Sequence, residues 1–453
     1  MGETFPGVIA FAFMASMLYA GAILRMRVPF LQSLLIPASI LGGIVGFIFI
    51  NAGLAFGYTS DDFVAFTFHF FTLSFMSLVL TGSPAGQPAG QGYLRGGLWL
   101  AMLWTMSLVM QAMIGLGVIL AFNEASSASV SPYLGMIVAH GFTQGPGQAL
   151  ALGSIWETTF DVTNAASTGL VYASFGFIVS FLVGVPVARL IISRGWNNNK
   201  KAELAKEFVE GIYQKASRPA SGQLITHPSN LESAAFHIGL LGVAYVLTYM
   251  WLSFLQGLAE GIQIGPVPIG LFVSFEFFFI HGLIVCSIMR GVIDRSGWGD
   301  FIDDDTQRMI TGVSVDLMVV GTLMSIKVAV VAALFVPIML TTVLVTAATI
   351  GLCFSLSQTG GQYNYERALT SFGCCCGSTG TGLLLLRMLD PDFRTPVAKE
   401  LAYFNIAILV TTAHVLIVVA PALPGFGLGT VAAIYFGTFI VAGALTFVVR
   451  PSQ

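Results

Sequence analysis

Two glycine- and hydroxyl-rich segments interrupt the otherwise apolar sequence of this chain. They are His140-Gly-Phe-Thr-Gln-Gly-Pro-Gly-Gln-Ala149 and Phe372-Gly-Cys-Cys-Cys-Gly-Ser-Thr-Gly-Thr-Gly382. Runs so rich in Gly, Thr and Pro make poor continuous helix. In lipid, irregular backbone persists only where protein buries it or where it lines a wet cavity. Two such breaks in corresponding halves indicate the substrate and ion site of a secondary transporter, and glycine-rich helix packing is the alternative.

The composition is that of a polytopic membrane protein. Of the 453 residues, 56% are hydrophobic and 9% are charged, whereas about a quarter are charged in an ordinary soluble domain. The net charge of −3 gives no indication of a nucleic-acid partner. The five cysteines lack CxxC spacing, which argues against a metal or disulfide framework. No catalytic or dinucleotide-binding motif occurs in a suitable context, so we expect neither an enzyme nor a cofactor other than a coupling ion.

Apolar stretches long enough to span a bilayer recur along the chain. A spanning helix needs about 20 apolar residues. The sequence predicts spans at 6–24, 30–50, 62–82, 96–121, 166–191, 234–257, 266–289, 309–326, 329–355, 400–420 and 428–448, with re-entrant hairpins near 132–154 and 368–386. The first stretch has Arg25 and Arg27 after it and no basic residue before it, the reverse of a signal peptide. We therefore expect a span whose N-terminus lies outside.

Basic residues indicate how the two hairpins face the membrane. The polar stretch 193–232 holds the largest concentration of Lys and Arg, so the positive-inside rule places it in the cytoplasm. Residues 122–131 and 155–165, on either side of the first hairpin, contain no Lys or Arg. The second hairpin is flanked by basic residues, namely Arg367, Arg387, Arg394 and Lys399. We therefore expect the hairpins to enter from opposite faces, as in an inverted repeat.

The predicted fold class is an all-α polytopic membrane protein with two inverted repeats of about five transmembrane helices, each with a re-entrant hairpin, and an extra C-terminal helix. The predicted divisions are a first repeat at 1–192, a cytoplasmic linker at 193–232, a second repeat at 233–420 and the additional helix within 421–453. A weak internal similarity agrees with this division, because Gly145 and Gly377 of the two hairpins are 232 residues apart.

The hairpin tips hold the candidate substrate-binding residues. Sodium is a hard cation that prefers oxygen ligands, as calcium and magnesium do more strongly. Broken helices also leave N-termini that attract carboxylates through unpaired amides and the helix dipole. Alternatively, the hydroxyls bond back to their own backbone. The candidates are Thr143, Gln144, Gly145, Gly147, Gly377, Ser378, Thr379 and Thr381.

Charged residues inside predicted spans are further candidates, because inserting one costs about 2.5–3.5 kcal/mol on insertion scales. Asp316 and Lys327 belong to one predicted span. Asp316 is a candidate sodium ligand or a structural carboxylate. Lys327 lies near the helix end, where its side chain can extend to the interface, so its charge does not require a substrate.

The chain resembles the bacterial sodium/glutamate symporter family over roughly residues 10–420. The similarity rests on the order and spacing of short segments. These are Ile36-Pro37 before Gly42-Gly43, Val109-Met-Gln111, Gln144-Gly-Pro-Gly147, Ala173-Ser-Phe-Gly176, Gly184-Val-Pro-Val-Ala-Arg189, Met324-Ser-Ile-Lys327, Asn364-Tyr-Glu-Arg367 and Gly377-Ser-Thr-Gly-Thr381.

This resemblance implies a sodium-coupled importer of a small anion, working as a homodimer with a mobile transport domain against a static dimerisation domain. It also places cation-binding polar residues in the helix after the second hairpin. Sodium candidates there are Asn405, Thr411, Thr412 and His414, beside Asp316 earlier in the chain. The chain departs from the family pattern at Gly141-Phe-Thr-Gln144 and at the three cysteines before the second tip, both close to the expected ligand.

The function that follows is sodium-coupled symport of a small carboxylate, glutamate or a related amino acid or dicarboxylate, by elevator-like alternating access. Proton coupling with the same architecture and a passive channel are the alternatives. The expected partners are a small anionic substrate, Na⁺, the lipid bilayer and a second copy of the chain, without nucleic acid. We expect a multi-pass protein of the inner (plasma) membrane with its N-terminus outside and its C-terminus in the cytoplasm.

Overall fold

The computed structural model describes residues 5–81, 91–200, 206–264, 267–391 and 393–451. Within these residues the protein is helical, apart from a two-residue antiparallel pairing of β1 (Gln263–Ile264) with β2 (Val267–Pro268). Eight of the described helices are long and apolar enough to cross a membrane. The protein is therefore an all-helical polytopic membrane protein, as the sequence predicts.

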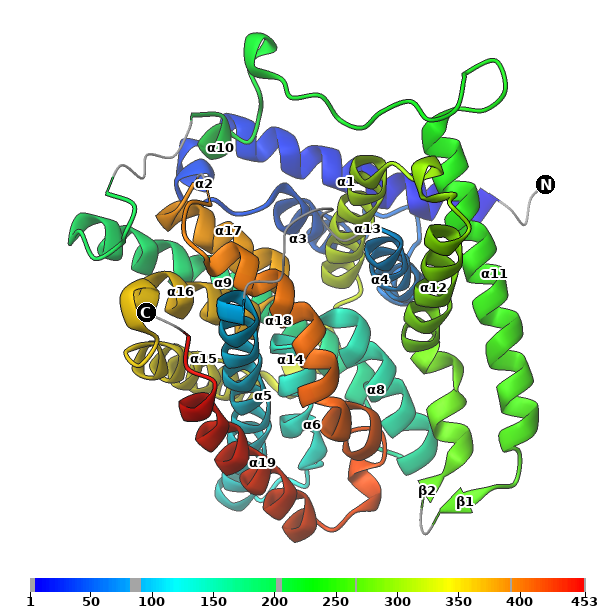
Figure 1. Cartoon of the computed structure of the whole chain (residues 1–453). Coiled ribbons are helices and arrows are strands. Elements are labelled where there is room, and N and C mark those ends of the chain that lie inside the picture. The colour runs from blue at the N-terminus through cyan, green and yellow to red at the C-terminus, as the bar shows by residue number, and fades with distance from the viewer. Residues whose placement is uncertain (1–4, 82–90, 201–205, 265–266, 392, 452–453) are drawn as a thin grey trace. The chain divides into compact units, whose positions relative to one another are not determined.

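The first half of the chain contains four long apolar helices and several short ones (Figure 1). In order they are α1 (Phe5–Arg27), α2 (Pro29–Ser33), α3 (Ala38–Asn51), α4 (Asp61–Leu80), α5 (Gln91–Ser126), α6 (Tyr133–Met136), α7 (Val138–Phe142), α8 (Pro146–Phe160) and α9 (Ala165–Ser193).

The second half begins after a polar connection that contains α10 (Lys206–Glu210). Its helices are α11 (Ser233–Ala259), α12 (Phe278–Arg295), α13 (Asp304–Met324), α14 (Val328–Ala333), α15 (Phe335–Ser357), α16 (Asn364–Cys376), α17 (Thr379–Leu389), α18 (Val397–Thr411) and α19 (Leu428–Val448). A π-helical segment, His414–Val419, follows α18.

The chain divides into two compact units. The first unit comprises Met1–Ala22, Gly42–Gln87 and Tyr213–Ser325. In it α4 packs along α13 and α12, and α12 packs against α11. The carboxylate of Asp303 caps α13 by accepting a hydrogen bond of 2.8 Å from the Thr306 amide, which satisfies one of the free donors of the first turn.

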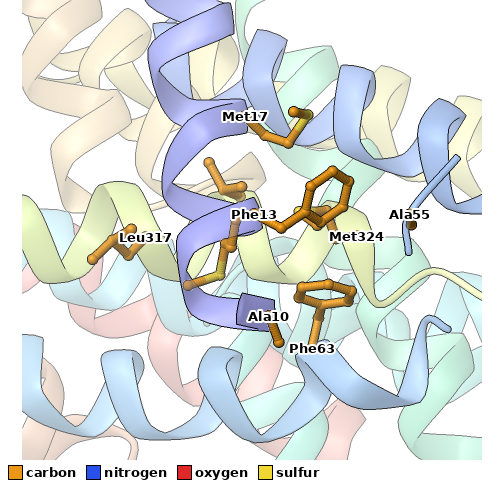
Figure 2. Close-up of a cluster of buried hydrophobic side chains, with 9 residues drawn as sticks. Ala10, Phe13, Met17, Ala55, Phe63, Leu317 and Met324 are labelled. Atoms are coloured by element: carbon orange, nitrogen blue, oxygen red, sulfur yellow. The ribbon is translucent and has the colours of Figure 1, made fainter. Parts of the chain in front are cut away.

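A buried apolar cluster holds α1, α4 and α13 together in this first unit. Figure 2 shows Phe13, Met17, Phe63 and Met324 converging from these helices. A Cβ on Gly42 would lie 2.3 Å from the Met17 carbonyl oxygen, so α3 lies directly against the backbone of α1. Close packing through small residues stabilises helix pairs in lipid, where exclusion of water supplies little driving force.

The second unit comprises Ile23–Leu41, Pro88–Ile212 and Ile326–Gln453, and it contains both helical hairpins. Helices α15, α18 and α19 pack along the long helix α5. The first hairpin, α6 to α8, packs mainly against α9, and the second hairpin, α16 and α17, packs against α9 and α15. The additional C-terminal helix α19 (red in Figure 1) thus belongs to this unit and lies beside α5.

Several predicted spans are divided in the structure. The predicted span 30–50 is split into α2 and α3, with Leu35 at φ 53° and Pro37 just before α3. Proline lacks an amide donor and disfavours helical geometry in the residue before it, which accounts for the break. Similarly, Leu334 separates α14 from α15 within the predicted span 329–355.

Two more boundaries differ from the predicted ones. Helix α13 ends at Met324, so Asp316 and Lys327 do not share a helix and the prediction that they do is wrong. Lys327 instead occupies the N-cap position of α14. In the predicted span 266–289, strand and 3₁₀ residues precede α12, which begins only at Phe278. Burial pattern alone does not reveal where the backbone leaves helical geometry.

Candidate functional site

The first hairpin turns at a glycine that no other residue replaces easily. Helix α7 ends at Phe142, and Gly145 has φ 89° and ψ 180° before Pro146 opens α8. Positive φ is accessible to glycine without strain, and proline at the first helical position loses no hydrogen bond. The predicted residues Thr143, Gln144 and Gly145 therefore form the tip itself, and Gly147 is buried in the first turn of α8.

The second hairpin turns at Gly377 and Ser378, between α16 and α17. The Ser378 hydroxyl oxygen accepts a hydrogen bond of 3.3 Å from the Thr381 amide and lies 3.3 Å from the Thr381 hydroxyl. Ser378 is thus the N-cap of α17. Part of the hydroxyl-rich sequence here serves to start a helix, as local side-chain bonding commonly does.

The two tips face each other within the second unit. A Cβ placed on Gly145 would lie 3.9 Å from the carbonyl oxygen of Gly377. Helix α9 approaches both hairpins, since a Cβ on Gly176 would lie 2.3 Å from the Cys376 carbonyl oxygen and 3.3 Å from the Phe142 Cα. The N-termini of α8 and α17, which carry free amides and positive dipole ends, therefore begin at adjoining tips.

A buried amide links the two hairpins. The Thr143 hydroxyl, in the first tip, donates to Gln111 Oε1 at 2.7 Å. Gln111 Nε2 donates to the carbonyl oxygen of Cys375, in the second hairpin, at 2.9 Å. The same nitrogen lies 3.1 Å from the hydroxyls of Ser107 and Thr349. Helices α5 and α15 and both hairpins therefore meet at one polar point.

A second polar pair lies beside the first tip. His140 Nδ1 and Gln144 Oε1 are 2.7 Å apart, and Trp156 meets the His140 ring edge-on at 5.9 Å. His140 is 1% exposed, and neither its Nε2 nor Gln144 Nε2 has a hydrogen-bond partner. Burying an unpaired polar atom costs about 1–3 kcal/mol, so these two atoms are candidates to contact a ligand.

The structure joins one predicted substrate residue to one predicted sodium residue. The Thr379 hydroxyl, in the first turn of α17, donates to Asn405 Oδ1 at 2.9 Å. Asn405 in turn donates through Nδ2 to the Leu401 carbonyl oxygen at 3.2 Å on its own helix, α18. The polar face of α18 is thereby connected to the second hairpin tip.

The remaining candidates near the end of α18 lie in different surroundings. Thr411 Oγ1 is buried without a partner, and the Thr412 hydroxyl donates to the Ile408 carbonyl oxygen. His414 is exposed and lies 3.2 Å, through Nε2, from the Thr438 hydroxyl of α19. The helix changes to π geometry at His414, and such irregular turns are frequent at functional sites.

Asp316 belongs to the first unit, on an exposed face of α13, whereas both hairpins belong to the second unit. Among the described residues no group of three or more His, Cys, Asp or Glu is placed to hold a metal ion. Cation binding at the hairpins would therefore rely on hydroxyl, amide and backbone oxygens, which suit a weakly held hard cation.

The segments that follow α9 and α18 form hydrogen bonds with the two hairpins. After α9, the Asn198 amide and side chain donate to the Glu366 carboxylate at 2.6 and 3.2 Å, at the start of the second hairpin. After the π segment, the Ala420 carbonyl oxygen accepts a hydrogen bond of 2.8 Å from the Trp156 indole of the first hairpin. The second hairpin is thus bonded to the segment after α9, in the first half of the chain. The first hairpin is bonded to the segment after the π-helical residues, in the second half.

No motif in the sequence predicts the contacts of Gln111 with Thr349 and with the Cys375 carbonyl. Gln111 belongs to Val109-Met-Gln111, one of the segments that carry the resemblance to the sodium/glutamate symporter family. A fully buried amide in the middle of an apolar helix, 0% exposed here, is the signal that could have found it.

Comparison with known proteins identifies the family of this chain. Residues 5–385 match the profile of the family described as Sodium/glutamate symporter. The chain is 23% identical over 292 residues to the Sodium/glutamate symporter of Escherichia coli (strain K12), a match that covers 63% of this chain and 65% of that protein. The protein of the same name from Shigella flexneri matches equally. The matched region thus spans just under two thirds of these relatives, and the chain belongs to the sodium/glutamate symporter family.

Proposed function

We propose that this protein is a sodium-coupled symporter that imports a small carboxylate, with glutamate as the first candidate and a related amino acid or dicarboxylate as the second. The observation that carries the proposal is the meeting of two hairpin tips in one unit, each tip opening a helix. The helix N-termini attract a carboxylate, and the hydroxyl and carbonyl oxygens beside them suit sodium. Family membership supports the same pairing of ion and substrate.

The proposal includes two repeats of opposite orientation. Helices and hairpins of the first half have counterparts about 232 residues later in the chain. For example, Tyr133 and Tyr365 stand at the starts of the two hairpins. Helix α1 corresponds in this way to α11, α9 to α18, and the hairpin α6–α8 to α16–α17. Lys and Arg flank the second hairpin and are absent beside the first, which favours entry from opposite faces.

The lengths of the hairpin helices are consistent with re-entrant hairpins, which do not cross the whole membrane. Helices α8, α16 and α17 have 15, 13 and 11 residues, which at about 1.5 Å per residue is shorter than the roughly 30 Å of a hydrocarbon core. Each leg would enter and leave by the same face. The irregular backbone at the tips is then protein-buried, as a lipid environment requires.

Elevator-like alternating access is the mechanism we propose for this division. Both hairpins lie in the second unit, and the boundary after Ser325 falls in the break between α13 and α14. The first unit would remain static and form the contact between two copies of the chain. The protein would reside in the inner (plasma) membrane with its N-terminus outside and its C-terminus in the cytoplasm.

Uptake into proteoliposomes tests this proposal. Labelled glutamate should accumulate above its external concentration when an inward Na⁺ gradient is imposed, and related amino and dicarboxylic acids rank the substrates by competition. Equilibration without accumulation would indicate a channel. Accumulation driven by a proton gradient in the absence of Na⁺ would favour the proton-coupled alternative, for which the buried His140 with its unpartnered Nε2 is the supporting observation.

A further inference from the structure

One end of the second unit is assembled from segments that are far apart in sequence. Beyond α9, the indole of Trp196 stacks on the ring of Tyr365 at the start of α16, with the ring centroids 5.1 Å apart. Arg367 of α16 pairs with Glu400 at the start of α18. A Cβ on Gly96, at the start of α5, would overlap the Glu400 carboxyl group. The end of α9 and the starts of α5, α16 and α18 therefore lie together.

The charges at this end are separated by burial. The end of α17 belongs to it as well, because Asn199 Nδ2 donates to Asp390 Oδ1 at 3.4 Å. Among the described residues of these segments, the acidic ones, Glu366, Asp390 and Glu400, are 0%, 0% and 2% exposed. Each of these carboxylates accepts hydrogen bonds from within the protein. The basic residues, apart from the buried Arg367, are exposed, and they define what we call the basic end: Arg95, Arg194, Lys200, Arg387, Arg394 and Lys399.

Three cations of the basic end lie over aromatic rings. Measured to the ring centroid, the pairs are Arg194 with Trp196 at 5.6 Å, Arg387 with Phe393 at 5.0 Å and Lys399 with Tyr93 at 5.2 Å. Tyr and Trp are enriched at the membrane–water interface, where their rings lie at the level of the lipid headgroups. A cation attracted to the face of such a ring is held at the same level instead of extending into water.

We propose that the basic end binds the headgroups of anionic phospholipids. A phosphodiester carries one negative charge, and its oxygens match the planar donor fork of arginine. Leu94 and Leu190, on α5 and α9, are 46% and 47% exposed and offer apolar surface to acyl chains, which a free phosphate does not have. The positive-inside rule places this end on the cytoplasmic side, where anionic lipids attract basic segments. The inference depends on neither the transported substrate nor the coupling ion.

Thermal unfolding of the purified full chain in a neutral detergent tests the proposal, with phosphatidylglycerol, phosphatidylcholine or inorganic phosphate added at equal concentration. A ligand that binds the folded state raises the melting temperature with its own concentration dependence. The test variant combines Arg194→Gln, Arg387→Gln and Lys399→Gln, which remove three charges at exposed positions. Arg308→Gln in the first unit is the control, because the Arg308 guanidinium is exposed and already paired with Asp305 Oδ1 at 2.8 Å.

We expect phosphatidylglycerol to raise the wild-type melting temperature more than the other two additives do, and added KCl to reduce the rise by screening. At about fivefold in affinity for each charge, the triple variant should require roughly a hundredfold more phosphatidylglycerol for half-maximal stabilisation, and each single variant about fivefold more. Arg308→Gln should match the wild type.

Three results would overturn the proposal. Equal stabilisation by inorganic phosphate would make the basic end a site for free anions. Equal stabilisation of the wild type by phosphatidylcholine would show that the headgroup charge is not recognised. A phosphatidylglycerol response that persists unchanged in the triple variant, and in each single variant, would place the lipid elsewhere on the protein.

Discussion

The guanidinium of Arg367 holds the carboxylate of Glu400 through two hydrogen bonds, Nε to Oε2 at 2.8 Å and Nη2 to Oε1 at 2.6 Å. Their side chains are 1% and 2% exposed, so the pair is desolvated. It joins the first leg of the second hairpin to α18, and Arg367 also donates to the Gly360 carbonyl oxygen. The bidentate geometry and the additional acceptor offset the desolvation of the charges.

Glu400→Gln should therefore destabilise the protein strongly, because it leaves the Arg367 charge buried without its counter-ion. Removing one partner of a buried pair costs about 3–5 kcal/mol. We expect a large drop in melting temperature, measured in detergent at constant salt. Glu124→Gln, at an exposed position before the first hairpin, is the matched control and should change little. Equal melting temperatures for the two variants would contradict the structural role of the pair.

A Cβ on Gly176 has no space in the structure. It would lie 2.3 Å from the Cys376 carbonyl oxygen, a backbone atom that moves only with the second hairpin. Gly176→Ala should displace that hairpin from α9, lower the melting temperature and reduce uptake at least tenfold by misplacing the tips. Gly117→Ala, in helix α5, meets nothing within 4 Å and should be neutral or slightly stabilising. Unchanged uptake by Gly176→Ala would show that the tips tolerate the shift.

The two hairpin tips are predictable from the sequence because their signals are local. Gly145 needs positive φ and Pro146 follows it, so the break is encoded in adjacent residues. Likewise, the Gly377-Ser378 turn carries its own N-cap. The contact of Gln111 with both hairpins could not be predicted, because its partners include a backbone carbonyl and hydroxyls from other elements, and a carbonyl oxygen has no sequence signature.

The divisions within the predicted spans 30–50 and 329–355 are not predictable from the sequence, for a different reason. Apolar character reports which residues avoid water, and it continues across Leu334, the break between α14 and α15. Only tertiary packing determines that the backbone leaves the helix between Ala333 and Phe335. The orientation of the repeats, inferred from Lys and Arg in the loops, stays a prediction.

That orientation predicts opposite labelling of the two hairpin flanks. In a background without the native cysteines, Ala125→Cys should react with an impermeant maleimide from outside the cell. Arg394→Cys should react only from the cytoplasmic side, as should the linker control Lys215→Cys. All three positions are exposed in the structure. If positions 125 and 394 react from the same side, the inverted repeat is wrong.

Thr379 offers a direct test of the substrate site. Its hydroxyl donates to Asn405 Oδ1 at 2.9 Å, and Thr379→Val keeps the volume while leaving that amide oxygen without its donor. The loss of about 1–3 kcal/mol should weaken apparent sodium or substrate affinity roughly tenfold to a hundredfold. Concentration dependence of uptake measures this, with expression and melting temperature checked in parallel. Thr72→Val is the control, because the Thr72 hydroxyl in α4 is buried without a partner, so replacing it with a methyl group should be neutral or stabilising. Equal losses at both positions would indicate a folding effect, and unchanged affinity in Thr379→Val would remove Thr379 from the site.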